Sequence, residues 1–265
     1  MNATHTDINN IPKKGIVRVL DKVFVIPDLN RERSVWLYLP SDYATSHHHY
    51  PVIYMHDGQN LFDASASFAG EWYIDESLDA LSHDGIKGAI VVGIENSRNG
   101  ETRIDEYSPW KNGRYNLGGQ GDIYINFIIH HLKPYVDANY RTLRDPANTG
   151  LMGSSMGGLI SLYGAIQYQH VFGRAGIFSP SFWFAGEVFS HVTKMGKQQD
   201  LKIYLIAGEK EGSNAARDTE RMGATLRSAG FSEQDVFLEI HADGEHSENY
   251  WAREFPKAYQ WLYIE

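Results

Sequence analysis

Residues 148–164 read NTGLMGSSMGGLISLYG, and this stretch decides the fold. A short apolar run that ends at Met152 leads into GSSMG, and apolar residues then continue at helical spacing. This order predicts a strand, a tight turn and a helix, with Ser155 at the apex of the turn. The glycines two residues before and two residues after Ser155 allow a sharp, strained backbone that raises its Oγ above a sheet.

The pattern G-x-S-x-G is by itself a weak signal, because a chain with 25 glycines can match it by chance. The alternative is a glycine-rich turn that packs a helix tightly on a sheet, with Ser155 as an ordinary first residue of that helix. The apolar run before the turn and the small-residue helix after it are the context that a nucleophile elbow requires. We therefore interpret Ser155 as a nucleophile.

From Pro51 onward, short continuous apolar runs alternate with stretches of helical spacing, which is typical of buried parallel strands in βαβ units. The predicted strands are residues 52–56, 89–94, 149–152, 175–178, 201–207 and 236–240. The predicted helices, besides the one after Ser155, are residues 71–82, 123–136, 215–228 and 250–263. The alternation predicts an α/β fold with a mostly parallel central sheet and helices on both faces.

The remaining segments are of other kinds. Residues 16–26 and 33–39 alternate apolar and polar positions around a turn-rich stretch, which predicts antiparallel N-terminal strands in a hairpin that leads into the sheet. Residues 1–14 are expected to form a flexible arm, and residues 15–265 a single domain. Residues 96–121 are polar, glycine-rich and follow a strand, so we expect a long loop over the site.

Composition excludes several classes of function. The 265 residues include no cysteine, so disulfides, thiolate metal sites and a cysteine nucleophile are excluded. A net charge of −9 without a basic block argues against binding to nucleic acid or to an anionic membrane. The polar first thirty residues lack the apolar core of a signal peptide, so the cytoplasm is the expected compartment. A secreted protein already stripped of its leader would have the same pattern.

A serine nucleophile needs a base to take its proton and an acid to orient that base. In this fold the order along the chain is serine, acid, histidine. The histidines that follow Ser155 are His170, His191, His241 and His246. We choose His246 as the base, because it stands in the loop after the last predicted strand, from which a side chain can reach over the serine. The acid is expected in the preceding loop, residues 208–214, where Glu209 and Glu211 both qualify.

The developing oxyanion needs backbone N–H donors. The first expected donor is Met156, directly after the serine, and the second comes from the loop after an earlier strand. In that loop Gly58 lets the backbone turn so that the N–H of Gln59 faces the site. The neighbouring His56 and Asp57 are interpreted as a structural pair at the strand end.

Six segments of the chain carry a resemblance to a known family. They read YMHDGQNLF (54–62), EYSP (106–109), GSSMGG (153–158), SPSFW (179–183), GEKE (208–211) and GEHSE (244–248). Together they are similar to the putative esterase family of α/β-hydrolases. That family includes feruloyl and acetyl-xylan esterases, S-formylglutathione hydrolase, siderophore esterases and mycolyltransferases. The similarity runs from about residue 15 to the end of the chain.

The resemblance implies an α/β-hydrolase fold, with Ser155 as nucleophile, His246 as general base and Glu211 as acid. Family members often have aspartate at the acid position, and some siderophore esterases lack a standard acid. The resemblance also implies Gln59 as the second oxyanion donor. The expected activity is hydrolysis of carboxylic esters or thioesters through an acyl-enzyme, without a metal or an organic cofactor.

The expected partner is a small-molecule ester, and a homo-oligomer is compatible with the sequence. Trp110, Trp183 and Trp251 lie in segments expected around the site, where aromatic walls suit flat acyl groups or sugar rings. Aromatic residues that only cap the edge of the sheet are an equal alternative. Two other functions stay open, namely acyl transfer to an alcohol by the same residues and non-catalytic binding on a hydrolase scaffold.

Overall fold

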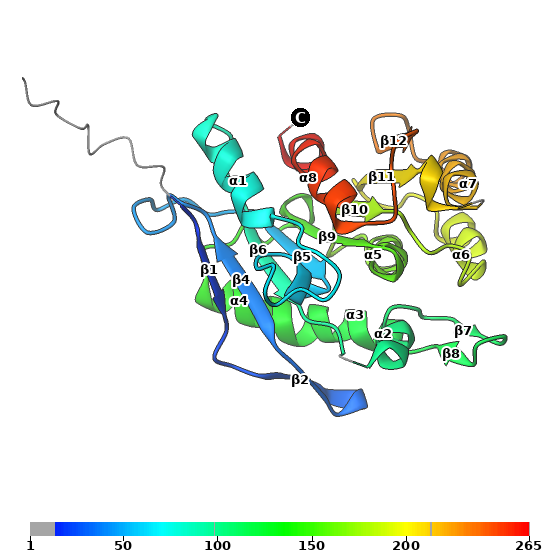
Figure 1. The fold of residues 1–265 in the computed structure, drawn as a ribbon, viewed down its shortest axis with the longest axis horizontal. Coiled ribbons are helices and arrows are strands. Elements are labelled where there is room, and N and C mark those ends of the chain that lie inside the picture. Colours follow the sequence, from blue (N-terminus) through cyan, green and yellow to red (C-terminus); the bar gives the residue numbers. More distant parts are fainter. Residues whose placement is uncertain (1–13, 98, 213, 265) are drawn as a thin grey trace, which may run out of the picture.

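A twisted eight-stranded sheet forms the centre of the molecule, in the order β1-β4-β6-β5-β9-β10-β11-β12 (Figure 1). The computed structural model describes residues 14–97, 99–212 and 214–264, so nearly all of the expected N-terminal arm lies outside the described residues. The strands are Ile16–Val19 (β1), Val35–Leu39 (β4), Val52–His56 (β5), Ile90–Ile94 (β6), Thr149–Ser154 (β9), Arg174–Phe178 (β10), Lys202–Gly208 (β11) and Val236–His241 (β12). β4 is antiparallel to both its neighbours, and every pair from β6 to β12 is parallel. The predicted sheet is thereby confirmed.

Helices cover both faces of this sheet, as predicted, because successive strand side chains point to opposite sides. Val52 and Tyr54 belong to one apolar cluster, and Ile53 and Met55 to the other. The first cluster is completed by α3 (Gly121–Phe127), α4 (Lys133–Asn139), α5 (Met156–Gln167), α6 (Glu187–Met195) and α7 (Ala215–Ser228). The second is completed by α1 (Ile74–His83) and α8 (Glu248–Tyr263). Among the described residues, no helix has the length and apolarity to cross a membrane.

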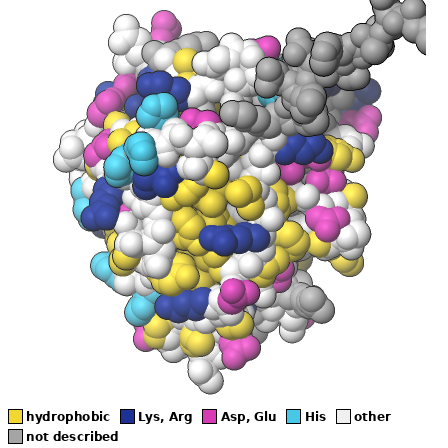
Figure 2. All heavy atoms as spheres, turned by 90° about the vertical axis from the view of Figure 1, so that its left-hand side faces the viewer, with side chains coloured by type: hydrophobic (Ala, Val, Ile, Leu, Met, Phe, Trp, Pro, Cys, Tyr) yellow, Lys and Arg dark blue, Asp and Glu magenta, His cyan; other side chains and the backbone are white. Residues whose placement is uncertain are grey.

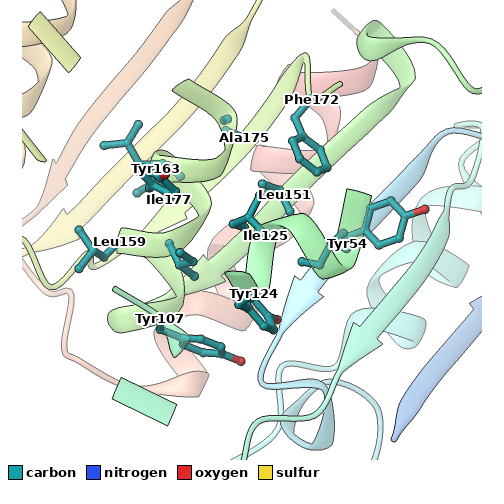
Figure 3. Close-up of a cluster of buried hydrophobic side chains, with 14 of the residues drawn as sticks. Tyr54, Tyr107, Tyr124, Ile125, Leu151, Leu159, Tyr163, Phe172, Ala175 and Ile177 are labelled. Atoms are coloured by element: carbon teal, nitrogen blue, oxygen red, sulfur yellow. The ribbon is translucent and has the colours of Figure 1, made fainter. Parts of the chain in front are cut away.

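The helix α5 is held by the larger of the two clusters. Figure 3 shows Leu151 and Ile177 from neighbouring strands beside Ile125 of α3 and Leu159 of α5. All four side chains are fully buried. Burial of each such side chain contributes roughly 1.5 to 3 kcal/mol. The packing therefore fixes α5, and with it the turn that precedes α5.

The predicted N-terminal hairpin is split into two parts. β1 pairs with β4 in the large sheet, whereas β2 (Phe24–Ile26) pairs with β3 (Arg31–Arg33) in a separate two-stranded sheet. Arg31 and Arg33 both bind the carboxylate of Glu106 in α2 (Gly100–Glu106). These ion pairs attach the two-stranded sheet of β2 and β3 to α2.

The segment 96–121, expected as a loop, contains regular structure. Besides α2 it holds a short hairpin of β7 (Lys111–Asn112) and β8 (Leu117–Gly118). α2 begins after Asn99, whose Oδ1 accepts a hydrogen bond from the N–H of Glu101 at 3.0 Å. A cap and buried charges stabilise this helix in place of an apolar face. Its sequence therefore lacks the apolar periodicity from which helices are predicted.

The helix predicted over residues 123–136 continues to Asn139. A π-helical turn, Ile128–Leu132, joins α3 to α4, and Pro134 lies in the first turn of α4. The wider π-helical turn accommodates Pro134, which has no N–H donor.

The expectation of a single domain from residue 15 to 265 stays a prediction.

β1 forms one edge of the sheet, on the left of Figure 1. Figure 2 looks onto this side, where apolar side chains gather among basic and acidic ones. Ile16 and Val19 of β1 are among the exposed large apolar residues. Three strands, β4, β6 and β5, separate β1 from β9, which leads into the turn before α5.

Candidate active site

Ser155 occupies a strained turn between β9 and α5. Its φ of 58° and ψ of −122° are unusual for a residue other than glycine. The turn is fixed by two backbone hydrogen bonds, from Ser155 N–H to the carbonyl of Phe178 and from Ser181 N–H to the carbonyl of Ser155, both at 3.0 Å. These bonds tie the elbow to the end of β10.

The glycines of the elbow leave room for close packing. A Cβ on Gly153 would lie 3.0 Å from the backbone of Gly157. A Cβ on Gly157 would lie 3.3 Å from Cβ of His56, and one on Gly158 would lie 3.1 Å from the carbonyl oxygen of Phe178. The elbow therefore favours glycine at these positions, because the neighbouring backbone and side chains leave little room for a Cβ atom.

His246 and Glu211 form a direct hydrogen bond. His246 Nδ1 lies 3.0 Å from Glu211 Oε2. The Glu211 side chain is 0% exposed, whereas that of His246 is 44% exposed. A neutral imidazole that donates through Nδ1 keeps Nε2 free to accept a proton. Glu209, the other carboxylate that qualified from the sequence, is exposed to solvent.

Two loops cross to make this contact. Glu211 follows β11, and His246 follows β12. A Cβ on Gly208 would overlap the backbone of Gly244, so the two loops touch at a pair of glycines. Lys210 N–H also donates to the carbonyl of Gly244 at 3.1 Å. The acid and the imidazole are thus held together by backbone contacts.

Ser155, Glu211 and His246 line one pocket of about 460 Å³ at the carboxyl ends of the parallel strands. The Oγ of Ser155 lies 3.1 Å from the Oγ of Ser181. Among the described residues it has no hydrogen bond to His246. The sequence predicted that His246 reaches over Ser155, so the resting orientation of the serine, towards Ser181, differs from that expectation. Hydrogen bonds of this kind often form only when substrate is bound.

The two expected oxyanion donors flank the elbow. Met156 is the first residue of α5, and Gln59 lies in a single 3₁₀ turn, Gly58–Asn60, after β5. Within the described residues, neither N–H donates to a backbone carbonyl. A Cβ on Gly58 would lie 2.5 Å from the backbone of Gly93, so this loop packs directly on β6. Neither residue is among those that line the pocket of Ser155, so their role as oxyanion donors stays a prediction.

His56 and Asp57 lie beneath the elbow. Burial lowers the pKa of His56 to about 3, so the imidazole is neutral. Its Nδ1 lies 2.9 Å from the hydroxyl of Tyr124. Burial opposes ionisation of Asp57, but the charge and hydrogen bonds of Arg103, with a hydrogen bond from Asn96, lower its pKa overall. Arg103 Nε and Nη2 each bind the Asp57 carboxylate at 2.7 Å.

The other histidines that follow the serine have different surroundings. His241 Nδ1 lies 2.7 Å from the hydroxyl of Tyr250, and its Nε2 lies 3.3 Å from Glu239. His191 packs against the rings of Trp110 and Tyr163.

The three tryptophans named from the sequence are placed differently from one another. Trp183 lines the pocket and is 58% exposed. Trp110 does not line the pocket; it packs against Tyr163. Trp251 is buried, and its ring lies edge-on to His246 with centroids 5.1 Å apart. Its Nε1–H donates to Ser179 Oγ at 2.7 Å. Ser179 and Ser181 belong to the segment SPSFW, but nothing in its spacing indicates these contacts.

Comparisons with known proteins show which family the chain belongs to. The family model described as "Putative esterase" matches residues 26–262. "Uncharacterized protein YbbA" of Bacillus subtilis is 29% identical over 245 residues, which cover 87% of this chain and 92% of that protein. "Iron(III) salmochelin esterase" of Escherichia coli is 28% identical over 218 residues, which cover 76% of this chain and 48% of that protein.

A solved structure shows the same fold. The enterobactin esterase FES from Shigella flexneri, in the presence of enterobactin, has a TM-score of 0.76 and 21% identity, and the match covers 95% of this chain and 60% of that one. The family match extends from β2 to α8 and includes every segment of the pocket. The chain therefore belongs to the esterase family described as "Putative esterase", and it is a carboxylic-ester hydrolase.

Proposed function

We propose that this chain hydrolyses small-molecule carboxylic esters or thioesters through an acyl-enzyme on Ser155. The observation that carries the proposal is the 3.0 Å contact between His246 Nδ1 and Glu211 Oε2, at the wall of the pocket that contains Ser155. Because the carboxylate accepts the Nδ1 proton, the Nε2 lone pair is the base that remains for the serine.

The first step begins when Ser155 Oγ leaves Ser181 and turns towards His246. The serine oxygen attacks the ester carbonyl carbon while Nε2 takes the serine proton, and the carbonyl oxygen becomes an oxyanion. The N–H groups of Met156 and Gln59 stabilise this charge, and loss of one such donor typically raises the barrier by roughly 3 kcal/mol. His246 then gives its proton to the leaving alcohol or thiol.

Water completes the cycle by attacking the acyl-enzyme with His246 as base. The imidazole is 44% exposed, so water reaches it without an acceptor having to bind first. This exposure favours hydrolysis over acyl transfer to an alcohol, which would use the same residues. Product formation that depends on an added alcohol, at fixed ester concentration, would instead support transfer.

Hydrolysis of p-nitrophenyl acetate tests the proposal. Ser155→Ala should lower kcat/KM by about 10⁴-fold or more, as expected for removal of a nucleophile. Ser190→Ala is the matched control, because Ser190 is an exposed serine of α6 outside the pocket. The control should keep wild-type activity. Full activity in a folded Ser155→Ala variant would overturn the proposal.

A further inference from the structure

A second row of side chains lies behind the proposed catalytic groups. Ser179, at the carboxyl end of β10, is 2% exposed. Its Oγ lies 2.7 Å from Trp251 Nε1 and 2.6 Å from Glu211 Oε1. An indole N–H can only donate, so Ser179 Oγ must accept from Trp251. Its own hydroxyl hydrogen is therefore directed at Glu211.

The Glu211 carboxylate receives a separate set of donors on each oxygen. Oε1 accepts from Ser179 Oγ and from the N–H of Gly208, both at 2.6 Å. Oε2 faces His246. A glutamate side chain has one more rotatable bond than aspartate, so it has more orientations to restrict. The two donors on Oε1 select the orientation in which Oε2 reaches the imidazole.

The backbone of Ser179 also has an unusual conformation. Its φ is 46°, in the left-handed region where glycine is the least strained residue. The N–H of Ser179 donates to the carbonyl of Ile206 at 2.8 Å, which holds the residue against β11. A residue other than glycine at such a strained backbone position suggests that its side chain has a functional role.

We infer that Ser179 is a positioning residue that, with Trp251 behind it, orients Glu211 towards His246. This inference rests on the proposed function, because Glu211 matters only if His246 acts as the base. Ser179 borders the pocket, and its hydroxyl hydrogen is directed at Glu211. Its hydroxyl acts through the carboxylate. Trp251 Nε1–H donates a hydrogen bond to Ser179 Oγ, and the Ser179 hydroxyl in turn donates one to Glu211.

Replacement of Ser179 by glycine and by alanine separates the hydroxyl from the backbone. Glycine relieves the strain at φ 46°, whereas alanine keeps it, and both remove the hydroxyl. A hydrogen bond to a charged group has a strength that corresponds to about 10- to 100-fold. Ser179→Gly and Ser179→Ala should therefore both lower kcat by about that factor with KM unchanged. Trp251→Phe, which removes only the N–H donor and part of the ring, should lower kcat less.

The decisive measurement is a double-mutant cycle with Glu211→Ala. If Ser179 acts through Glu211, Ser179→Gly should lower kcat in the wild-type background and cause no further loss in Glu211→Ala. An equal loss of kcat in both backgrounds, or wild-type kcat in Ser179→Gly, would overturn the inference about Ser179. The proposed function would then still stand. Full activity of Glu211→Ala would instead overturn the acid in the proposed function. Thermal melts of each variant report whether it is folded.

Discussion

At the scale of single residues, the length of Glu211 matches its surroundings. Its carboxylate reaches from a 3₁₀ turn, Glu209–Glu211, back to the N–H of Gly208 and forward to His246. Glu209 stands two residues earlier in the same turn and points into solvent. The residues alone left both glutamates open, because both carry a carboxylate in the same loop after the strand. The family resemblance implied Glu211, and the direction of each side chain, which depends on the crossing of two loops, distinguishes the two in the structure.

Substitution of each glutamate by glutamine tests this difference. Glu211→Gln should lower kcat by roughly 10² to 10⁴, because an amide at this position can hold the imidazole in the wrong tautomer. Glu209→Gln should have nearly wild-type kinetics and serves as the matched control. Steady-state hydrolysis of p-nitrophenyl acetate measures both, and a larger loss in Glu209→Gln would contradict the assignment.

Neutral His56 makes stability depend on pH. Its pKa is about 3 in the folded protein, against an ordinary value of about 6.5 in an unfolded chain. Between these values the unfolded state binds one more proton, so stability falls as pH drops from about 6.5 towards 3. The contribution is at most roughly 1.4 kcal/mol per pH unit.

The free energy of unfolding, measured by urea titration between pH 7 and 4.5, checks this contribution. His56→Gln removes the titrating group, so its stability should fall less steeply with decreasing pH than that of the wild type. Parallel curves for the two proteins would show that His56 contributes nothing to the pH dependence.

At the scale of secondary-structure elements, periodicity predicted most of the strands and helices that pack through apolar faces, but the predicted helices did not include α6, whose Val188, Phe189 and Val192 are buried. It missed α2, which has other supports. Glu106 of α2 is fully buried, and Arg33 of β3 is nearly so. Arg103 of the same helix binds Asp57, directly beside the loop of Gln59. A run of polar residues predicts a loop unless the residues that bind them are known. The residues that bind Arg103 and Glu106 lie 46 to 75 positions away in the sequence.

Loss of the buried carboxylate should destabilise the fold around α2. Glu106→Ala leaves the guanidinium of Arg33 buried without its partner, which typically costs about 3 to 5 kcal/mol. Glu101→Ala removes an exposed glutamate from the first turn of the same helix and should cost less than about 1 kcal/mol. Chemical denaturation gives both values, and equal losses would contradict the importance of the buried ion pair.

At the scale of the whole molecule, the parallel sheet explains why distant residues meet. Ser155, Glu211 and His246 follow β9, β11 and β12, whose carboxyl ends lie on one edge. The order of strands along the chain was therefore enough to predict that these loops converge. It was not enough to predict the resting partner of Ser155, which depends on how the loop after β10 folds over the elbow and brings Ser181 within 3.1 Å.

Covalent labelling with diethyl p-nitrophenyl phosphate tests the central claim most directly, because Ser155 and Ser181 are both hydroxyl groups of the same pocket. The account predicts complete inactivation with one phosphoryl group per chain, located by peptide mass spectrometry on Ser155. Ser181→Ala should still be labelled, and Ser155→Ala should not. A label on Ser181 in the wild type, or inactivation of Ser155→Ala at the wild-type rate, would contradict the account.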